Sequence, residues 1–138
     1  MSVKLPVRRL VAHCDPFSNP WTEEPLSPKD VQSALAEGRL LAEAFGILSE
    51  WGARQHAERI AYLVVHGWDE PIEVDVGIPA FGCFPPWFVD DGNHRLAAAV
   101  VAGHEFIEAS VAGDIDYAME LFGVDVTEKA DDQVEAVC

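Results

Sequence analysis

Basic residues are scarce in this chain, and they are unevenly distributed. The 138 residues include 9 Lys and Arg against 24 Asp and Glu, which gives a formal net charge of −15. Residues 61–138 contain only two Lys or Arg and sixteen Asp or Glu, so this half has a net charge of −14. Proteins that bind duplex DNA neutralise several phosphates with clustered cations. The acidic C-terminal half therefore disfavours DNA binding.

Cysteines and long apolar runs are also few. Cys14, Cys83 and Cys138 show no C-x-x-C spacing and cannot all pair with one another, so a reduced, cytoplasmic protein is the simplest account. No apolar run reaches membrane length, and no signal-peptide pattern begins the chain. We therefore expect no membrane association. The length suits a single domain over residues 1–124, followed by a flexible acidic tail over residues 125–138.

Hydrophobic periodicity and turn signals predict an alternation of helices and strands. With 49% hydrophobic residues, a globular fold is expected. Ser27-Pro28 begins the clearest helix, because serine caps helices and proline favours their first position. We expect Gly38 to break or bend this helix. The predicted strands are 4–12, 71–76, 87–90 and 106–112, and the predicted helical segments are 28–50, 55–66, 96–102 and 114–122.

The most informative stretch is Asp91-Gly92-Asn93-His94-Arg95. It follows a short apolar run and precedes a helix of small residues, so it predicts a strand, a glycine turn and a helix start. Backbone N–H groups at such a helix start attract anions, phosphates above all. Arg95 strengthens this interpretation, because it is the only Lys or Arg between Arg59 and Lys129.

The order of these segments resembles the ParB/sulfiredoxin superfamily, specifically the ParB-like N-terminal domain. The similarity covers roughly residues 55–112, with residues 5–16 as a plausible first strand. The matching residues are Glu58-Arg59-Ile60, Gly67, Pro71-Ile72-Glu73-Val74, Asp91-Gly92-Asn93-His94-Arg95-Leu96-Ala97-Ala98-Ala99 and Ala102-Gly103.

The resemblance implies an α+β fold in which helices pack a small mixed sheet. It also implies that the motif helix receives nucleotide phosphates, with ATP, ADP or CTP and Mg²⁺ as the expected ligands. The superfamily includes nucleotide hydrolases, kinases and nuclease-like proteins, so the fold does not determine the reaction. Asn93 stands where sulfiredoxin needs a cysteine, which argues against sulfinic-acid repair. The chain after Gly123 is too short for the helix-turn-helix domain of partition proteins.

Each motif residue has a functional and a structural interpretation. Arg95 suits bidentate phosphate binding, or it forms a salt bridge to a nearby carboxylate. In the functional interpretation, His94 donates a hydrogen bond to a transferring phosphate or acts as an acid or base. In the structural interpretation, it is a hydrogen-bonded histidine that orients the turn. Gly92 supplies a positive backbone torsion or a close ligand approach. Asn93 is expected to cap the helix and to contact phosphate.

The adjacent carboxylates Asp90 and Asp91 suit Mg²⁺ bound to a nucleotide, or acceptance of a proton from an attacking hydroxyl. Successive strand residues point to opposite faces, so only one of them is expected to face the site. The resemblance favours Asp91, and the structural alternative is that Asp91 fixes the turn.

These residues predict a nucleotide-dependent phosphohydrolase or phosphotransferase, and a ParB-like nuclease is the alternative within the same chemistry. A non-catalytic acidic protein that mimics nucleic acid and binds a basic protein partner is the second hypothesis. A nucleotide-gated switch without efficient turnover is the third.

Overall fold

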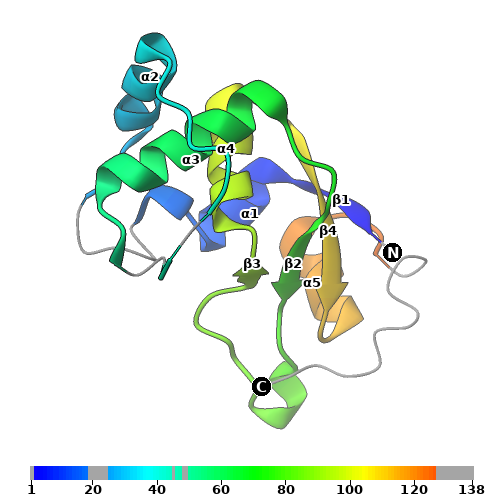
Figure 1. The fold of residues 1–138 in the computed structure, drawn as a ribbon. Helices are drawn as coiled ribbons and strands as arrows, with labels where there is room; N and C mark the ends of the chain where they lie inside the picture. Colours follow the sequence, from blue (N-terminus) through cyan, green and yellow to red (C-terminus); the bar gives the residue numbers. More distant parts are fainter. Residues whose placement is uncertain (1, 19–24, 45, 48–49, 127–138) are drawn as a thin grey trace. The chain divides into compact units, whose positions relative to one another are not determined.

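The computed structural model describes residues 2–18, 25–44, 46–47 and 50–126, which form five α-helices and a four-stranded mixed sheet (Figure 1). The predicted α+β class is confirmed. The chain divides into two compact units. The sheet unit comprises Met1–Cys14, Glu70–Asn93 and Glu105–Cys138, and the helical unit comprises Asp15–Asp69 and His94–His104. Within the described ranges, none of the helices combines the length and apolarity needed to cross a bilayer. Most of the predicted tail lies outside these ranges.

The sheet has the strand order β1-β4-β2-β3 (Figure 1). The central strand β4 (Phe106–Ala112) pairs antiparallel with β1 (Val3–Pro6) and parallel with β2 (Ile72–Asp75). The edge strand β3 (Val89–Asp91) pairs antiparallel with β2. Alternate residues of β4 are buried, as the period of two predicts. These residues are Ile107, Ala109 and Val111.

The predicted first strand over residues 4–12 is wrong beyond Pro6, where the chain turns into helix α1 (Val7–His13). Val7 and Leu10 are three residues apart, lie on one helical face and are buried. Arg8 and Arg9 are both exposed in this helix. In a strand, adjacent side chains point to opposite faces, so one arginine would have pointed inward.

Helix α2 (Pro28–Glu37) begins where the sequence predicted it. Ser27 is its N-cap, and the Asp30 carboxylate accepts a hydrogen bond from the Ser27 backbone N–H at 2.9 Å. Gly38 ends the helix with a left-handed φ of 67°. The expected helical continuation is wrong for residues 39–44, because this stretch lies along α3 instead. The Leu41 N–H donates to the Glu58 carbonyl at 3.0 Å.

The helical unit has a core formed by α2, α3 (Ala53–His66) and α4 (Asn93–Ala102). The predicted helix over 55–66 is confirmed, and Gly67 follows its last residue. The alanines of α4 bring their helix close to its neighbours, since a small side chain allows close backbone approach. The buried core residues are Leu26, Val31, Ala34, Ala57, Ile60, Ala61, Leu63, Ala97 and Ala98.

Helix α5 (Ile115–Phe122) closes the described part of the sheet unit, and it was predicted at its observed position. The Asp114 carboxylate caps it by accepting from the Tyr117 N–H at 3.0 Å. Arg9 of α1 donates to the Leu121 carbonyl at 3.4 Å, which joins the two helices.

The predicted connection over residues 77–86 contains a short 3₁₀ helix, η3 (Pro79–Phe81), and a bridge between Ile78 and Cys83. Cys14 is a buried free thiol, in agreement with a reduced protein. Cys83 is disulfide-bonded, so the expectation of fully reduced cysteines is wrong at this residue.

Gly113 offers a stringent test of the packing after β4. Its φ is 101°, and a Cβ there would lie 2.7 Å from the Gly77 carbonyl oxygen and 2.8 Å from the Gly77 nitrogen. We expect Gly113→Ala to lower the free energy of unfolding by about 3 kcal/mol, because backbone cannot yield as a flexible side chain does. Urea denaturation measures this change.

Gly82→Ala is the matched control, because Gly82 has a φ of 75° but open space around its would-be Cβ. It is expected to cost only about 1 kcal/mol. If the two variants unfolded at the same urea concentration, the close approach of residue 113 to Gly77 would not constrain the fold.

Candidate functional site

The motif runs from the end of β3 through Gly92 into α4. Gly92 has a φ of 112°, so the predicted positive torsion is confirmed. Asp91, Gly92 and Asn93 belong to the sheet unit, whereas His94 and Arg95 begin the part of α4 that belongs to the helical unit. The strand, turn and helix start that the sequence predicted are therefore all present.

The sheet-unit end of the motif is strongly acidic. Exposed Asp91 lies opposite Glu73 of β2, and buried Asp75 accepts a hydrogen bond from the Gly77 N–H at 2.8 Å. The pKa of Asp90 is raised, first by partial burial and then by the negative charges of Asp75 and Glu73. A cation would relieve this repulsion.

Mg²⁺ binding by Asp91 stays a prediction. The described part of the chain holds no group of three or more His, Cys, Asp or Glu side chains arranged to bind a metal ion. Mg²⁺ commonly uses one or two protein carboxylates together with water and substrate phosphates. The carboxylates at this strand end are therefore chemically suitable ligands for a nucleotide-bound Mg²⁺.

Asn93 is the first residue of α4 and not the cap residue before it, so the predicted cap is wrong by one position. Its Oδ1 accepts a hydrogen bond from the Trp87 indole Nε1–H at 2.9 Å. This bond ties the start of α4 to the segment before β3. Any phosphate contact from Asn93 would then use its backbone N–H or its side-chain Nδ2.

His94 lies in a cluster of rings within the helical unit. Its Nε2 is 2.8 Å from Nδ1 of His56, which is fully buried on α3. The ring of Trp51 lies 5.2 Å from that of His56 and 6.0 Å from that of His94, centroid to centroid. One imidazole must donate and the other accept, so the two tautomers are coupled.

The environment keeps His94 neutral. Burial, followed by the neighbouring His56 and the positive charges of Arg59 and Arg95, lowers the pKa of His94 to about 3. At neutral pH the ring therefore exists as imidazole and not as imidazolium. Arg95 is half-buried in the first turn of α4, and its permanent positive charge is one of those that act on His94.

Sequence reasoning missed His56 and Trp51 as neighbours of the motif. His56, Ile60 and Leu63 follow helical spacing, so His56 belongs to the buried face of α3. That spacing was visible in the sequence and pointed to a buried histidine. Its pairing with His94, 38 positions later, required the tertiary structure.

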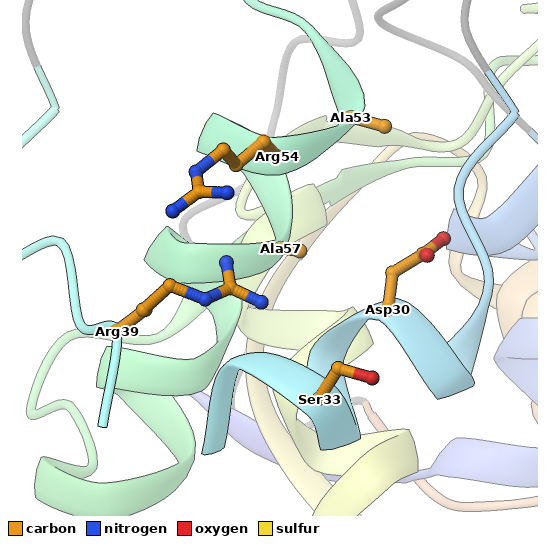
Figure 2. Close-up of a pocket in the computed structure, with 6 residues that line it drawn as sticks. All are labelled: Asp30, Ser33, Arg39, Ala53, Arg54 and Ala57. Carbon is orange, nitrogen blue, oxygen red and sulfur yellow. The ribbon is translucent and has the colours of Figure 1, made fainter. Parts of the chain in front are cut away.

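A pocket of about 200 Å³ lies elsewhere in the helical unit, between α2 and α3 (Figure 2). None of the motif residues lines it.

The His56–His94 pair predicts acid sensitivity. His94 has a pKa of about 3 in the folded protein and an ordinary value near 6.5 when unfolded, so the unfolded chain binds more protons between these values. Its contribution to stability is complete above pH 6.5 and is lost as the pH falls toward 3. We expect a loss of roughly 3–5 kcal/mol over this range. Urea unfolding at a series of pH values measures it.

His94→Gln isolates this effect from carboxylate titration, because it removes the titrating ring. Its stability should depend less steeply on pH between 6.5 and 4 than that of the wild type. His66→Gln, at the exposed end of α3, should keep the wild-type slope. Parallel pH profiles for wild type and His94→Gln would refute the neutral buried pair.

Comparison with known proteins found no match of any of three kinds. No family model matches the chain, no curated protein matches it, and no solved structure matches its fold. The resemblance to the ParB/sulfiredoxin superfamily therefore rests on the motif residues and their order, and membership stays a prediction.

Proposed function

We propose that this chain is a cytoplasmic nucleotide-binding protein of the ParB-like type, and that it hydrolyses or transfers a phosphoryl group at Asp91–Arg95. The ligand would be ATP, ADP or CTP with Mg²⁺. The buried Cys14 thiol agrees with a reducing compartment, whereas the disulfide at Cys83 counts against one.

The observation that carries the proposal is the backbone at Gly92. Its φ of 112° turns the chain from β3 directly into the ten-residue helix α4. The first N–H groups of a helix have no partner within the helix, and the helix dipole places partial positive charge beside them. Arg95 adds a permanent positive charge in the same first turn. These features together favour an anionic ligand.

Asp91 is the residue that we propose for Mg²⁺ or for accepting a proton from the attacking hydroxyl. It ends an exposed strand edge, and Glu73 lies opposite it. Bound Mg²⁺ would neutralise charge on the phosphates. Partial burial, followed by the negative charges of Asp75 and Glu73, raises the pKa of the neighbouring Asp90, so a cation bound near this edge would be electrostatically favourable.

For His94 the geometry favours the orienting role over direct acid–base chemistry. A ring with a pKa of about 3 carries no extra proton to donate near neutral pH, and its Nε2 is engaged with His56. We propose that His94 anchors the start of α4 to α3. Arg95, the next residue, then presents its guanidinium from a helix turn of defined orientation.

Arg95→Ala tests the proposal by isothermal titration with ATP, ADP, CTP and GTP in the presence of Mg²⁺. Wild-type protein should show saturable binding of at least one nucleotide. The variant should bind it about tenfold more weakly or worse, since a charge-assisted hydrogen bond contributes about 1.5–3 kcal/mol. Arg8→Ala, at an exposed position of α1, removes the same charge and should bind as wild type.

Two further results separate the alternatives. Release of inorganic phosphate from the bound nucleotide would support a phosphohydrolase, and tight binding without release would support the nucleotide-gated switch. Cleavage of an oligonucleotide that Asp91→Asn abolishes would support the nuclease. If no nucleotide gives saturable heat with the wild type, the nucleotide proposal fails.

A second candidate, the non-catalytic acidic binding protein, is favoured by one specific observation. After partial burial, the negative charges of Asp75 and Glu73 add to the raised pKa of Asp90, so part of the acidic charge is clustered. Such a cluster suits a basic protein partner. Salt-sensitive binding of polylysine, weakened in Glu73→Gln with Asp90→Asn, would support this function, and binding indifferent to these changes would exclude it.

A further inference from the structure

The pocket between α2 and α3 has charges of opposite sign at its two ends (Figure 2). Its volume is about 200 Å³, below the roughly 300–1,000 Å³ of sites that enclose drug-sized ligands. All of its lining residues belong to the helical unit: Asp30, Ser33, Arg39, Ala53, Arg54 and Ala57. A ligand of only a few heavy atoms would fit.

One carboxylate holds the two arginines of the cationic end together. Oε2 of Glu58 accepts from Arg39 Nη1 at 2.7 Å and lies 3.0 Å from Arg54 Nε. Arg39 Nε also pairs with Glu37 at 3.1 Å. The ion pair that Arg54 makes with the described residues uses Nε alone, and its side chain is 72% exposed. Its terminal nitrogens can therefore face a ligand.

The anionic end is built on α2. Asp30 and Ser33 are three residues apart, so their side chains lie on one face of the helix. The Ser27 N–H and hydroxyl both bond Oδ2 of Asp30, at 2.9 and 3.2 Å, which orients this carboxylate. Figure 2 shows Asp30 on the opposite side of the pocket from the two guanidinium groups, with Ala57 between them. The alanines leave room and offer only apolar contact.

The local charges restrict the class of ligand. The two arginines are already paired with Glu37 and Glu58, and Asp30 lies at the other end of the pocket. A phosphate or polyphosphate would therefore find little uncompensated positive charge here. A ligand with separated charges of both signs would instead meet a complementary group at each end.

We propose that this pocket binds a small zwitterion of the amino acid class. The ligand carboxylate pairs with Arg54 beside Arg39, and the ligand ammonium group pairs with Asp30 and the Ser33 hydroxyl. Arginine suits this task because its planar guanidinium presents two parallel donors to a carboxylate. The site is separate from the nucleotide motif and does not depend on the function proposed for it.

Titration of ¹⁵N-labelled protein with glycine, L-alanine and 4-aminobutanoate, followed by NMR, tests this proposal. The three probes carry the same charges, and 4-aminobutanoate separates them more widely. At least one should give saturable shifts at the lining residues of α2 and α3. Acetate and methylammonium, with one charge each, should bind at least about tenfold more weakly, because each forms only half of the charged contacts.

Arg54→Gln and Asp30→Asn should each weaken binding of the zwitterion about tenfold or more. Lys29→Gln is the matched control, because Lys29 is exposed on α2 and does not line the pocket. Arg95→Ala should leave binding unchanged. Well-dispersed spectra of every variant verify that they remain folded.

Three outcomes would overturn the proposal. The first is the absence of saturable shifts with all three zwitterions. The second is acetate binding as tightly as glycine, which would reduce the pocket to a simple anion site. The third is wild-type affinity in both folded pocket variants, which would place the binding elsewhere.

Discussion

The hydrogen bond between the imidazoles of His56 and His94 is the interaction on which the motif helix depends. It joins α3 to α4 inside the helical unit, next to the ring of Trp51. Burial and nearby positive charge lower the pKa of His94 to about 3, so the pair remains uncharged under ordinary conditions. An uncharged pair can be buried at modest cost, whereas a protonated one would need a compensating anion. The burial that brings His94 against His56 therefore also keeps His94 from acting as an acid near neutral pH.

Charge organises the rest of the molecule in two different ways. At the end of β3, partial burial and the negative charges of Asp75 and Glu73 raise the pKa of Asp90, so negative charge is unfavourable there. Between α2 and α3, Glu58 forms ion pairs with two arginines, and cationic and anionic groups lie at opposite ends of a pocket. The overall charge of −15 is thus distributed in locally different arrangements of acidic and basic groups.

Several elements could be predicted because their signals are local. Ser27-Pro28 begins α2, Asp114 caps α5, and alternating burial marks β4. Two predictions failed because a local pattern was ambiguous. The apolar content of residues 7–13 fits either a strand or a helix, but only the helix leaves both Arg8 and Arg9 exposed. After Gly38 the apolar spacing continued, but a left-handed glycine ended α2 and the chain packed along α3.

The sequence by itself indicated the α+β class through the order of its segments. It also determined the positive torsion at Gly92 and the strand–turn–helix course of the motif, since these depend on neighbouring residues. Only the tertiary structure decided that His56 is the partner of His94, that Trp87 binds Asn93, and that Arg39 and Arg54 share Glu58. Arg54–Glu58 and Trp87–Asn93 are close in the sequence, four and six positions apart. His56–His94 and Arg39–Glu58 join segments that only the folded chain brings together, because local spacing can indicate that a side chain is buried but not which distant residue it contacts.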